Sequence, residues 1–203
     1  MPIRIYLASS NPGKLRELAA LAEEQEIELA LLPDYERLPP AREDDASFAL
    51  NALEKALHYS QLTGELVVAD DSGLVVDALG GRPGVYSARY AGPNATDEDN
   101  NRKLVEELRG LPPEKRSARY VCVLALAQRN RILALISDSC EGRLLEAPRG
   151  TGGFGYDPYF FYPPLNCTLA EVSTAEKNQH SHRAKAFRKL LAYLQQRPFA
   201  SRA

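Results

Sequence analysis

Strand-like and helix-like patterns alternate along the first 70 residues, and this alternation most constrains the fold. Residues 3–7 alternate apolar and more polar side chains, as a half-buried strand does. Apolar residues then recur at helical spacing over residues 15–22. A second strand at 27–32, a second helix from 48 to 57 and a third strand at 66–69 repeat the order. The pattern predicts an α/β protein.

The second half of the chain favours a mixed sheet. Tyr120 to Ala127 and Ile132 to Ile136 are predicted strands joined by Arg129-Asn130, which indicates a hairpin. Thr96 to Asp99 has the spacing of a capping box and predicts a helix that ends near Leu108. A hairpin after an alternating first half predicts a mixed sheet flanked by helices.

The remaining segments are read as two loops and one helix. Leu79 to Gly92 and Gly150 to Tyr156 are rich in glycine or proline and predict ordered loops. Apolar residues between Ala184 and Leu194 form the stripe of a final helix. No linker or repeat interrupts the chain, so a single domain over residues 1–203 is expected.

Composition and charge are those of an ordinary soluble globular protein. The 203 residues are 44% hydrophobic and 26% charged, which argues against disorder. The net charge of -2 argues against a nucleic-acid partner. No apolar stretch reaches membrane-spanning length, and the N-terminal run carries Arg4, so neither a membrane partner nor a signal peptide is expected. Three cysteines without a pairing pattern favour a reducing, cytoplasmic location.

The stretch SSNPGK, Ser9 to Lys14, joins the first predicted strand to its helix. Asn11 suits the helix N-cap and Pro12 the first helical position, so Lys14 falls in the first turn. The helix dipole favours anions there, and a lysine is better placed beside a bound anion. Backbone N–H groups and the two serine hydroxyls would cradle a phosphate. Leu15 excludes a Walker A loop. An ordinary turn is the alternative.

Two adjacent acids, Asp70 and Asp71, follow the apolar run Val67 to Ala69. The sequence places them at the carboxyl end of a strand, where ligands gather in open α/β sheets. Neighbouring strand residues point to opposite faces, so the two acids need not share a role. One could bind a hard cation and activate water, while the other orients that water or a lysine. The alternative is a plain turn, which Asp-Ser-Gly also suits.

An acidic loop, Glu43 to Asp45, precedes the helix that carries Asn51 and Lys55. Acids in this place commonly cap a helix, which is the favoured interpretation of Asp44 and Asp45. By default, Lys55 is a solvated lysine on a helix surface.

Two later motifs combine aromatic, acidic and basic residues. GTGGFGYDP, Gly150 to Pro158, interleaves four glycines with two aromatic rings and Asp157. Glycines permit close backbone approach, aromatic rings offer a face to a nucleobase, and a carboxylate accepts from ring N–H groups. In KNQHSHR, Arg183 could donate to a carbonyl oxygen and His182 could donate or accept. For either histidine of this motif alone, an ordinary surface position is the alternative.

Taken in order, SSNPGK, ADDSG, PGVYSARYAG, GTGGFGYDP and SHR closely resemble motifs of the inosine triphosphate pyrophosphatase family, over nearly the whole chain. The resemblance implies an elongated mixed β-sheet flanked by helices, with two lobes around a central active-site cleft. It also implies a Mg²⁺-dependent homodimer. The implied reaction hydrolyses ITP, dITP and XTP to the monophosphate and pyrophosphate, and thereby clears deaminated purines from the nucleotide pool.

The resemblance assigns roles to single residues. Asp71 would be the catalytic proton acceptor and a metal ligand, Asp70 a supporting catalytic acid, and Glu43 a metal ligand. The residues expected to bind substrate, through its phosphates or its base, are Ser9, Ser10, Asn11, Pro12, Gly13, Lys14, Lys55, Ser72, Phe154, Gly155, Tyr156, Asp157, Lys177, His182 and Arg183.

The chain also departs from the family pattern. Leu50-Asn51-Ala52 stands where the family commonly has Glu-Asn-Ala, and the acidic loop after Glu43 differs too. Two alternatives therefore stay open: a pyrophosphohydrolase that acts on another nucleotide, and a nucleotide-binding protein without turnover.

Base selection needs its own explanation. Hypoxanthine and xanthine carry a 6-oxo group where adenine has an amine, so a site that donates to this oxygen rejects adenine. Arg183 and backbone N–H groups of the Gly-rich loop are the candidate donors.

Overall fold

The computed structural model describes residues 3–43 and 46–196, and the chain forms two compact units. The first unit comprises Met1–Asp71, Cys122–Asp138 and Arg183–Ala203, and the second comprises Ser72–Val121 and Ser139–His182. Several motifs of the sequence are split at these boundaries, because Asp71 and Ser72 belong to different units, as do His182 and Arg183. The single domain and the two lobes around a cleft stay predictions.

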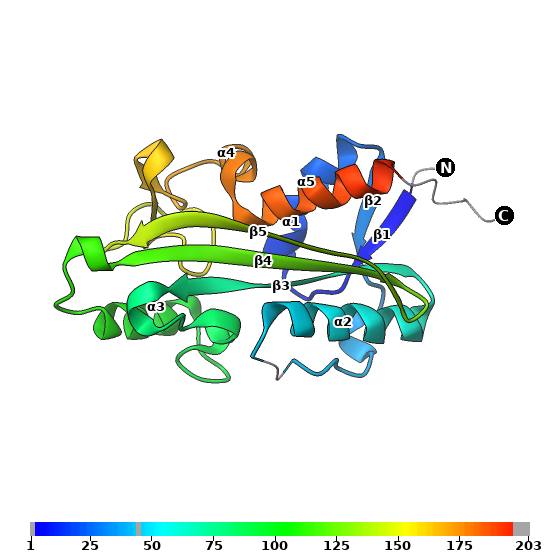
Figure 1. Ribbon diagram of the computed structural model, residues 1–203, viewed down its shortest axis with the longest axis horizontal. Coiled ribbons are helices and arrows are strands. Elements are labelled where there is room, and N and C mark those ends of the chain that lie inside the picture. Colours follow the sequence, from blue (N-terminus) through cyan, green and yellow to red (C-terminus); the bar gives the residue numbers. More distant parts are fainter. Residues whose placement is uncertain (1–2, 44–45, 197–203) are drawn as a thin grey trace. The chain divides into compact units, whose positions relative to one another are not determined.

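Within the described residues, seven strands form one sheet in the order β2-β1-β3-β4-β5-β6-β7 (Figure 1). The strands are β1 (Ile3–Leu7), β2 (Ile27–Leu31), β3 (Leu66–Val76), β4 (Ser117–Gln128), β5 (Arg131–Leu144), β6 (Phe160–Tyr162) and β7 (Cys167–Thr168). β1 is parallel to β2 and β3, whereas β6 is antiparallel to β5 and β7. The predicted mixed sheet flanked by helices is thus confirmed.

Helices α1 and α3 begin at the predicted capping residues. The α-helices are α1 (Pro12–Glu23), α2 (Phe48–Thr63), α3 (Asp97–Glu107), α4 (Thr174–His180) and α5 (His182–Gln195). Short 3₁₀ helices are η1 (Tyr35–Arg37), η2 (Asp77–Leu79), η3 (Gly84–Arg89), η4 (Pro113–Lys115) and η5 (Pro163–Leu165). Asn11 caps α1 by accepting from Gly13 N, and Thr96 and Asp99 form the predicted capping box of α3.

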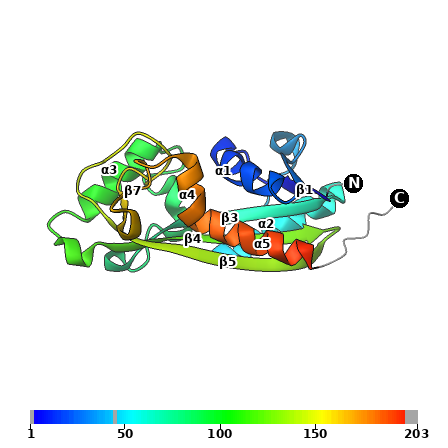
Figure 2. The same ribbon diagram turned by 90° about the horizontal axis from the view of Figure 1, so that it is seen from above.

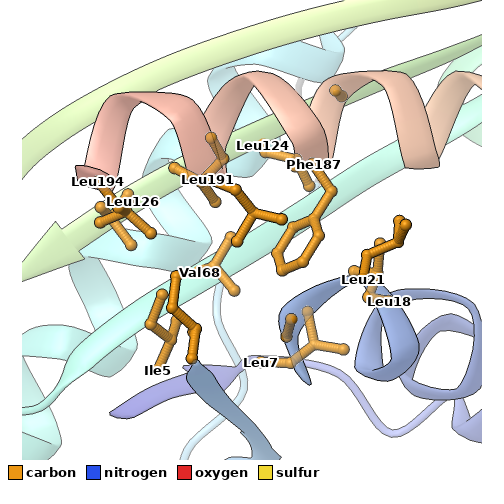
Figure 3. Close-up of a cluster of buried hydrophobic side chains, with 14 of the residues drawn as sticks. Ile5, Leu7, Leu18, Leu21, Val68, Leu124, Leu126, Phe187, Leu191 and Leu194 are labelled. Atoms are coloured by element: carbon orange, nitrogen blue, oxygen red, sulfur yellow. The ribbon is translucent and has the colours of Figure 1, made fainter. Parts of the chain in front are cut away.

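Helices α1 and α5 cover one face of the strands of the first unit (Figure 2). Phe187 and Leu191 of α5 pack with Leu18 of α1, Val68 of β3 and Leu124 of β4 (Figure 3). Since strand residues alternate between faces, Val68 on this face places Asp70 on the same face and Asp71 on the opposite one. The apolar stripe predicted for the final helix is confirmed.

The second unit has its own core. Leu74 and Val76 of β3 pack with Leu104 of α3 and with Phe160 and Leu169.

Among residues 3–43 and 46–196, the helices lack the length and apolar character that a membrane crossing needs. The predicted hairpin is confirmed, with Arg129 and Asn130 in its turn between β4 and β5. Both turn residues have positive φ, as a two-residue turn of type I′ requires.

Three predictions about local structure were wrong. β3 does not end at Ala69 but continues through the acids to Val76. The turn chemistry of Asp-Ser-Gly is overridden because Leu74 and Val76 enter the second core. The segment Leu79 to Gly92 is not only loop, since it contains η3, and helix α4 precedes the final helix where none was predicted.

Candidate active site

The turn between β1 and α1 has the geometry expected from SSNPGK. Asn11 Oδ1 accepts from Gly13 N at 2.8 Å, and Ser9 Oγ accepts from Asn11 N at 3.1 Å. The first turn of α1 contains no acid, so Lys14 meets the positive end of the helix dipole. Its Nζ donates to Asp70 Oδ1 at 3.1 Å and to Asp70 O at 3.3 Å. The predicted phosphate-binding turn and the acid pair therefore lie together in the first unit.

The two acids face different partners, as the strand alternation predicts. Asp70 lies on the face covered by α1 and α5, where Lys14 and Arg183 donate to it. Asp71 lies on the face covered by α2, where Asn51 Nδ2 donates to its Oδ2 at 3.1 Å. The acids stand within a strand, and each has cationic or amide partners of its own. This separation reduces the repulsion expected of neighbouring carboxylates.

Asp70 belongs to a buried chain of alternating charges. Arg183 donates from Nε to Asp70 Oδ2 at 2.7 Å and from Nη1 to Glu17 Oε2. Together with Lys14, this cluster of side chains contains two cations and two carboxylates, so the formal charges within the cluster cancel. Burial alone would lower the pKa of Arg183, but the neighbouring Asp70 and Glu17 carboxylates raise that pKa above its ordinary value. Asp70 is 1% exposed and anchors both cations from beneath the turn.

Asp71 has a pKa that lies closer to neutral pH than that of an ordinary aspartate. Burial raises the pKa of Asp71 to about 6, while Lys55, the Asn51 hydrogen bond and Lys14 oppose this rise. A carboxylate with a pKa of this size is ionised at pH 7 and is still a useful proton acceptor. Asp71 therefore suits the role of general base, whereas Asp70 is committed to two ion pairs.

Lys55 and Glu43 form an ion pair beside Asp71. Lys55 Nζ lies 2.6 Å from Glu43 Oε2, and its side chain is 8% exposed. The prediction of a solvated lysine is therefore wrong, because α2 turns this side chain inward. Asp44 and Asp45, predicted to cap the helix, lie outside the described residues. Residues 3–43 and 46–196 contain no cluster of three or more His, Cys, Asp or Glu side chains arranged for a metal ion.

The Gly-rich loop of the second unit is held by its own acid. Asp157 Oδ2 accepts from Phe154 N at 2.9 Å and from Lys177 Nζ at 2.5 Å. Gly153 has a φ of +70°, and a Cβ there would lie 2.1 Å from Asp157 Oδ2. Only glycine fits at this position. Lys177 Nζ also lies 4.7 Å from the centroid of the Phe154 ring.

The other predicted contacts of the second unit are Ser72, Tyr156 and His182. Tyr156 is buried and its hydroxyl donates to Ser87 O at 2.7 Å, so this ring supports the loop from inside. His182 stacks on Tyr120 with ring centroids 4.7 Å apart and planes within 9°. Ser72 is half-buried in β3. The second unit thus contains Phe154 to Asp157, Lys177, His182 and Ser72. The first unit contains the predicted phosphate-binding turn, Lys55 and Asp71.

Comparison with known proteins identifies the family. The model of the Ham1 family matches residues 5–193. The chain belongs to the Ham1 family. One relative, the dITP/XTP pyrophosphatase of Geobacillus kaustophilus (strain HTA426), is 51% identical over 186 residues, which cover 92% of this chain and 91% of that protein. The dITP/XTP pyrophosphatase of Geobacter sulfurreducens (strain ATCC 51573 / DSM 12127 / PCA) is 47% identical over 94% of this chain and 96% of its own length.

A solved HAM1 protein from Coxiella burnetii has the same fold. It superposes with a TM-score of 0.85 at 39% identity, over 96% of this chain and 100% of its own. These Ham1 relatives confirm the family resemblance that the sequence motifs carry. The individual residue roles that the resemblance implies stay predictions.

Sequence reasoning missed several residues of this Ham1 chain that hold the predicted ones. Glu17 pairs with Arg183, and Tyr120 stacks on His182. Asn51 was noted only as a neighbour of Lys55, and its hydrogen bond to Asp71 was not foreseen. One signal was available for Glu17, because it stands three residues after Lys14 and so projects from the same side of α1. Tyr120 gave no signal, since an aromatic residue in a strand is ordinary.

Proposed function

We propose that the chain is a hydrolase that cleaves the deaminated purine nucleotides ITP, dITP and XTP to the nucleoside monophosphate and pyrophosphate. Its relatives at 43–51% identity are named dITP/XTP pyrophosphatase. The observation that carries the proposal is the environment of Asp71, a buried carboxylate with a pKa of about 6, beside Asn51 and Lys55. Such an enzyme would cleanse the nucleotide pool.

Asp71 acts as the proton acceptor in this proposal. A water molecule attacks the α-phosphorus, a new P–O bond forms, and the bond to the β-phosphate bridge breaks. Pyrophosphate leaves with the bridging oxygen, and the proton of the water passes to Asp71. Asn51 keeps the carboxylate oriented through its hydrogen bond to Oδ2. A positioned base of this kind contributes roughly 10²–10⁴-fold to the rate.

The triphosphate would be bound by cationic groups of the first unit. Lys14, the N-terminus of α1 and Lys55 supply that charge, with the hydroxyls of Ser9 and Ser10 as further donors. Asp70 keeps Lys14 in place through the 3.1 Å contact. Lys55 already pairs with Glu43, so a phosphate group would compete with that carboxylate for the ammonium.

The donor set also fits Mg²⁺. This ion prefers oxygen ligands and is commonly held by one or two carboxylates together with substrate phosphates. Asp71 and Glu43 both interact with the ammonium of Lys55, so two carboxylates surround one positive charge here. We propose that they hold Mg²⁺, which would neutralise phosphate charge in the transition state.

Residues of the second unit are proposed to read the base. The backbone N–H groups of Phe154, Gly155 and Asp157 already donate within this unit. Arg183, the donor proposed from the sequence, belongs to the first unit, where its Nε and Nη1 donate to Asp70 and Glu17. Lys177 and His182 are further donors of this kind. Adenine has an amine in place of the 6-oxo oxygen, so it would leave such a donor without an acceptor.

Three further properties belong to the proposal. A homodimer is supported by the family resemblance and is tested by sedimentation of the purified protein. A cytoplasmic location is supported by the buried thiols Cys122 and Cys140. One pyrophosphatase domain over the whole chain is supported by relatives that match it along nine-tenths or more of their length.

The test is a pyrophosphate-release assay with Mg²⁺ and a panel of nucleotides. ITP, dITP and XTP are compared with the four ordinary ribonucleoside triphosphates and with dATP and dGTP. Turnover of the deaminated purines, with one monophosphate formed per pyrophosphate, supports the proposal. Orthophosphate as the first product, or equal turnover of all purines, contradicts it.

A further inference from the structure

Helix α3 holds both polar backbone groups of one residue in the Gly-rich loop. Asp97 Oδ2 accepts from Gly155 N at 2.7 Å, and Asn101 Nδ2 donates to Gly155 O at 2.9 Å. Asp97 and Asn101 are four residues apart, so they lie on the same side of α3. Gly155 has a φ of +61° and turns the chain sharply. Fixing this one residue therefore sets the directions of its neighbours.

Asn101 is not explained by stability alone. It is 7% exposed, and its Oδ1 has no hydrogen-bond partner within residues 3–43 and 46–196. The orientation of its amide is settled by Gly155 O, because only Nδ2 can donate to a carbonyl. A buried polar atom without a partner lowers stability, and an apolar side chain of similar shape would avoid this cost. The hydrogen bond that Asn101 does make goes to the Gly-rich loop, which points to a task there.

The adjacent asparagine provides a contrast. Asn100 Oδ1 accepts from Ala91 N at 2.8 Å, and its Nδ2 donates to Ala88 O at 3.1 Å. Both ends of the Asn100 amide are therefore used to hold the segment after η3. Asn100 has the contacts of a structural residue, whereas Asn101 serves Gly155 with one end only.

The part of α3 that holds Gly155 is itself fixed by further contacts. Thr96 and Asp99 close the capping box at the start of α3, which fixes the first turn that carries Asp97. On the other side of Gly155, the loop is tied by Phe154 N to Asp157, and Asp157 pairs with Lys177. The ring of Phe154 thus lies between two fixed points, one on α3 and one on α4.

We propose that Asp97 and Asn101 are positioning residues for the nucleobase, because they hold Gly155 so that Phe154 and Asp157 are ordered before the nucleotide arrives. The inference rests on the proposed function, in which residues 154–157 bind the base. A loop that is ordered in advance loses less entropy on binding, so the anchor increases affinity. Both side chains act through Gly155 and not through contact with the substrate.

The experiment compares variants that keep or remove each hydrogen bond. Asp97→Ala removes the acceptor, whereas Asp97→Asn keeps an oxygen that can accept from Gly155 N. Asn101→Leu removes both the donor and the buried unpartnered oxygen. Glu98→Ala is the matched control, because Glu98 is 87% exposed on the same turn of α3. Steady-state kcat and KM are measured for ITP and ATP with Mg²⁺, together with the melting temperature.

We expect KM for ITP to rise roughly tenfold in Asp97→Ala and Asn101→Leu, which is the effect of one charge-assisted or buried hydrogen bond. The value of kcat should change less than about threefold, because Asp71 and the phosphate-binding residues are untouched. Asp97→Asn and Glu98→Ala should stay near wild type. Asn101→Leu should keep or raise the melting temperature, which a purely structural asparagine would not do.

Amide exchange of Gly155 provides a readout that does not depend on turnover. Exchange of this amide should be faster in Asp97→Ala and close to wild type in Asp97→Asn. The inference is overturned if KM for ITP is unchanged in both Asp97→Ala and Asn101→Leu. It is also overturned if KM rises as much in Asp97→Asn as in Asp97→Ala. In either case, turnover of ITP by the wild-type protein leaves the proposed function intact. Absence of ITP turnover in the wild-type protein overturns the proposed function and this inference with it.

Discussion

Arg183 donates from Nε to Asp70 Oδ2 at 2.7 Å, and this ion pair joins residues 113 positions apart in a buried part of the first unit. Asp70 also accepts from Lys14, so this carboxylate contacts two cations, and Glu17 supplies a second carboxylate to Arg183. Within residues 3–43 and 46–196, the neighbouring Asp71 has no such pair of cationic donors, and burial raises its pKa instead. Adjacent acids of the same type therefore have opposite electrostatic roles, and substitutions can separate them.

Asp70→Asn should destabilise the protein strongly. The substitution leaves Arg183 and Lys14 without their shared carboxylate, and breaking a buried pair in this way costs about 3–5 kcal/mol. Urea unfolding should show this loss as a lower midpoint with an unchanged slope. Asp71→Asn, one residue further on, is the matched control and should not be destabilised near neutral pH. Equal midpoints for Asp70→Asn and wild type would refute the anchoring role of Asp70.

Asp71→Asn should abolish most turnover of ITP. Asparagine cannot accept the proton of the attacking water, so kcat should fall by roughly 10²–10⁴-fold. Circular dichroism and sedimentation should match the wild type, because the amide can still accept from Asn51. Turnover near the wild-type rate in a correctly folded Asp71→Asn protein would remove Asp71 from the role of general base.

The raised pKa of Asp71 also predicts how stability depends on pH. With a folded-state pKa of about 6 against an unfolded value of 3.8, the folded protein binds this proton more tightly. This tighter proton binding stabilises the folded protein fully at pH values below the unfolded-state pKa of 3.8, and the stabilisation is lost as the pH rises through about 6. Above that pH, the buried charge costs about 3 kcal/mol relative to the protonated form.

Asp71→Asn removes this cost and its pH dependence. In EDTA, the melting temperature of the variant should exceed that of wild type by several degrees near pH 8. The difference should narrow near pH 5, where the wild-type carboxyl is mostly protonated. A difference that is constant with pH, or that widens towards acid, would show that the pKa of Asp71 is not raised.

The close approach of Gly153 to Asp157 predicts different effects for two neighbouring glycines. Both Gly153 and Gly155 have positive φ, so alanine at either position pays about 1–2 kcal/mol for its backbone conformation. At Gly153 a Cβ also displaces the Asp157 carboxylate, whereas no atom lies within 4 Å of a Cβ at Gly155. Gly153→Ala should therefore lose more stability in urea unfolding than Gly155→Ala. Equal losses would contradict the clash with Asp157.

The sequence predicted those features that depend on local patterns. The alternation of residues 3–7 and the capping box of Thr96 concern neighbouring residues, and both were confirmed. The opposite faces of Asp70 and Asp71 follow from strand geometry alone and were confirmed by their separate partners. The motifs also indicated the family, because their order along the chain is specific to that family.

Features that depend on distant residues could not be predicted from local patterns. β3 continues past Ala69 because its far end packs into the second core, which outweighs the turn chemistry of Asp-Ser-Gly. The pairing of Arg183 with Asp70 and Glu17 joins three separate elements, so spacing along the chain contains no trace of it. Lys55 was misread because its inward orientation depends on how α2 packs and not on its own helix pattern.

Pyrophosphate release from ITP decides whether the protein is the proposed hydrolase. The purified protein is assayed with ITP and, in parallel, with ATP, in Mg²⁺ and again in EDTA, and both pyrophosphate and monophosphate are quantified. We expect equal amounts of IMP and pyrophosphate, loss of the reaction in EDTA, and a kcat/KM for ITP at least about 100-fold above that for ATP. Binding of ITP without turnover, or turnover that favours ATP or another nucleotide, would contradict this expectation.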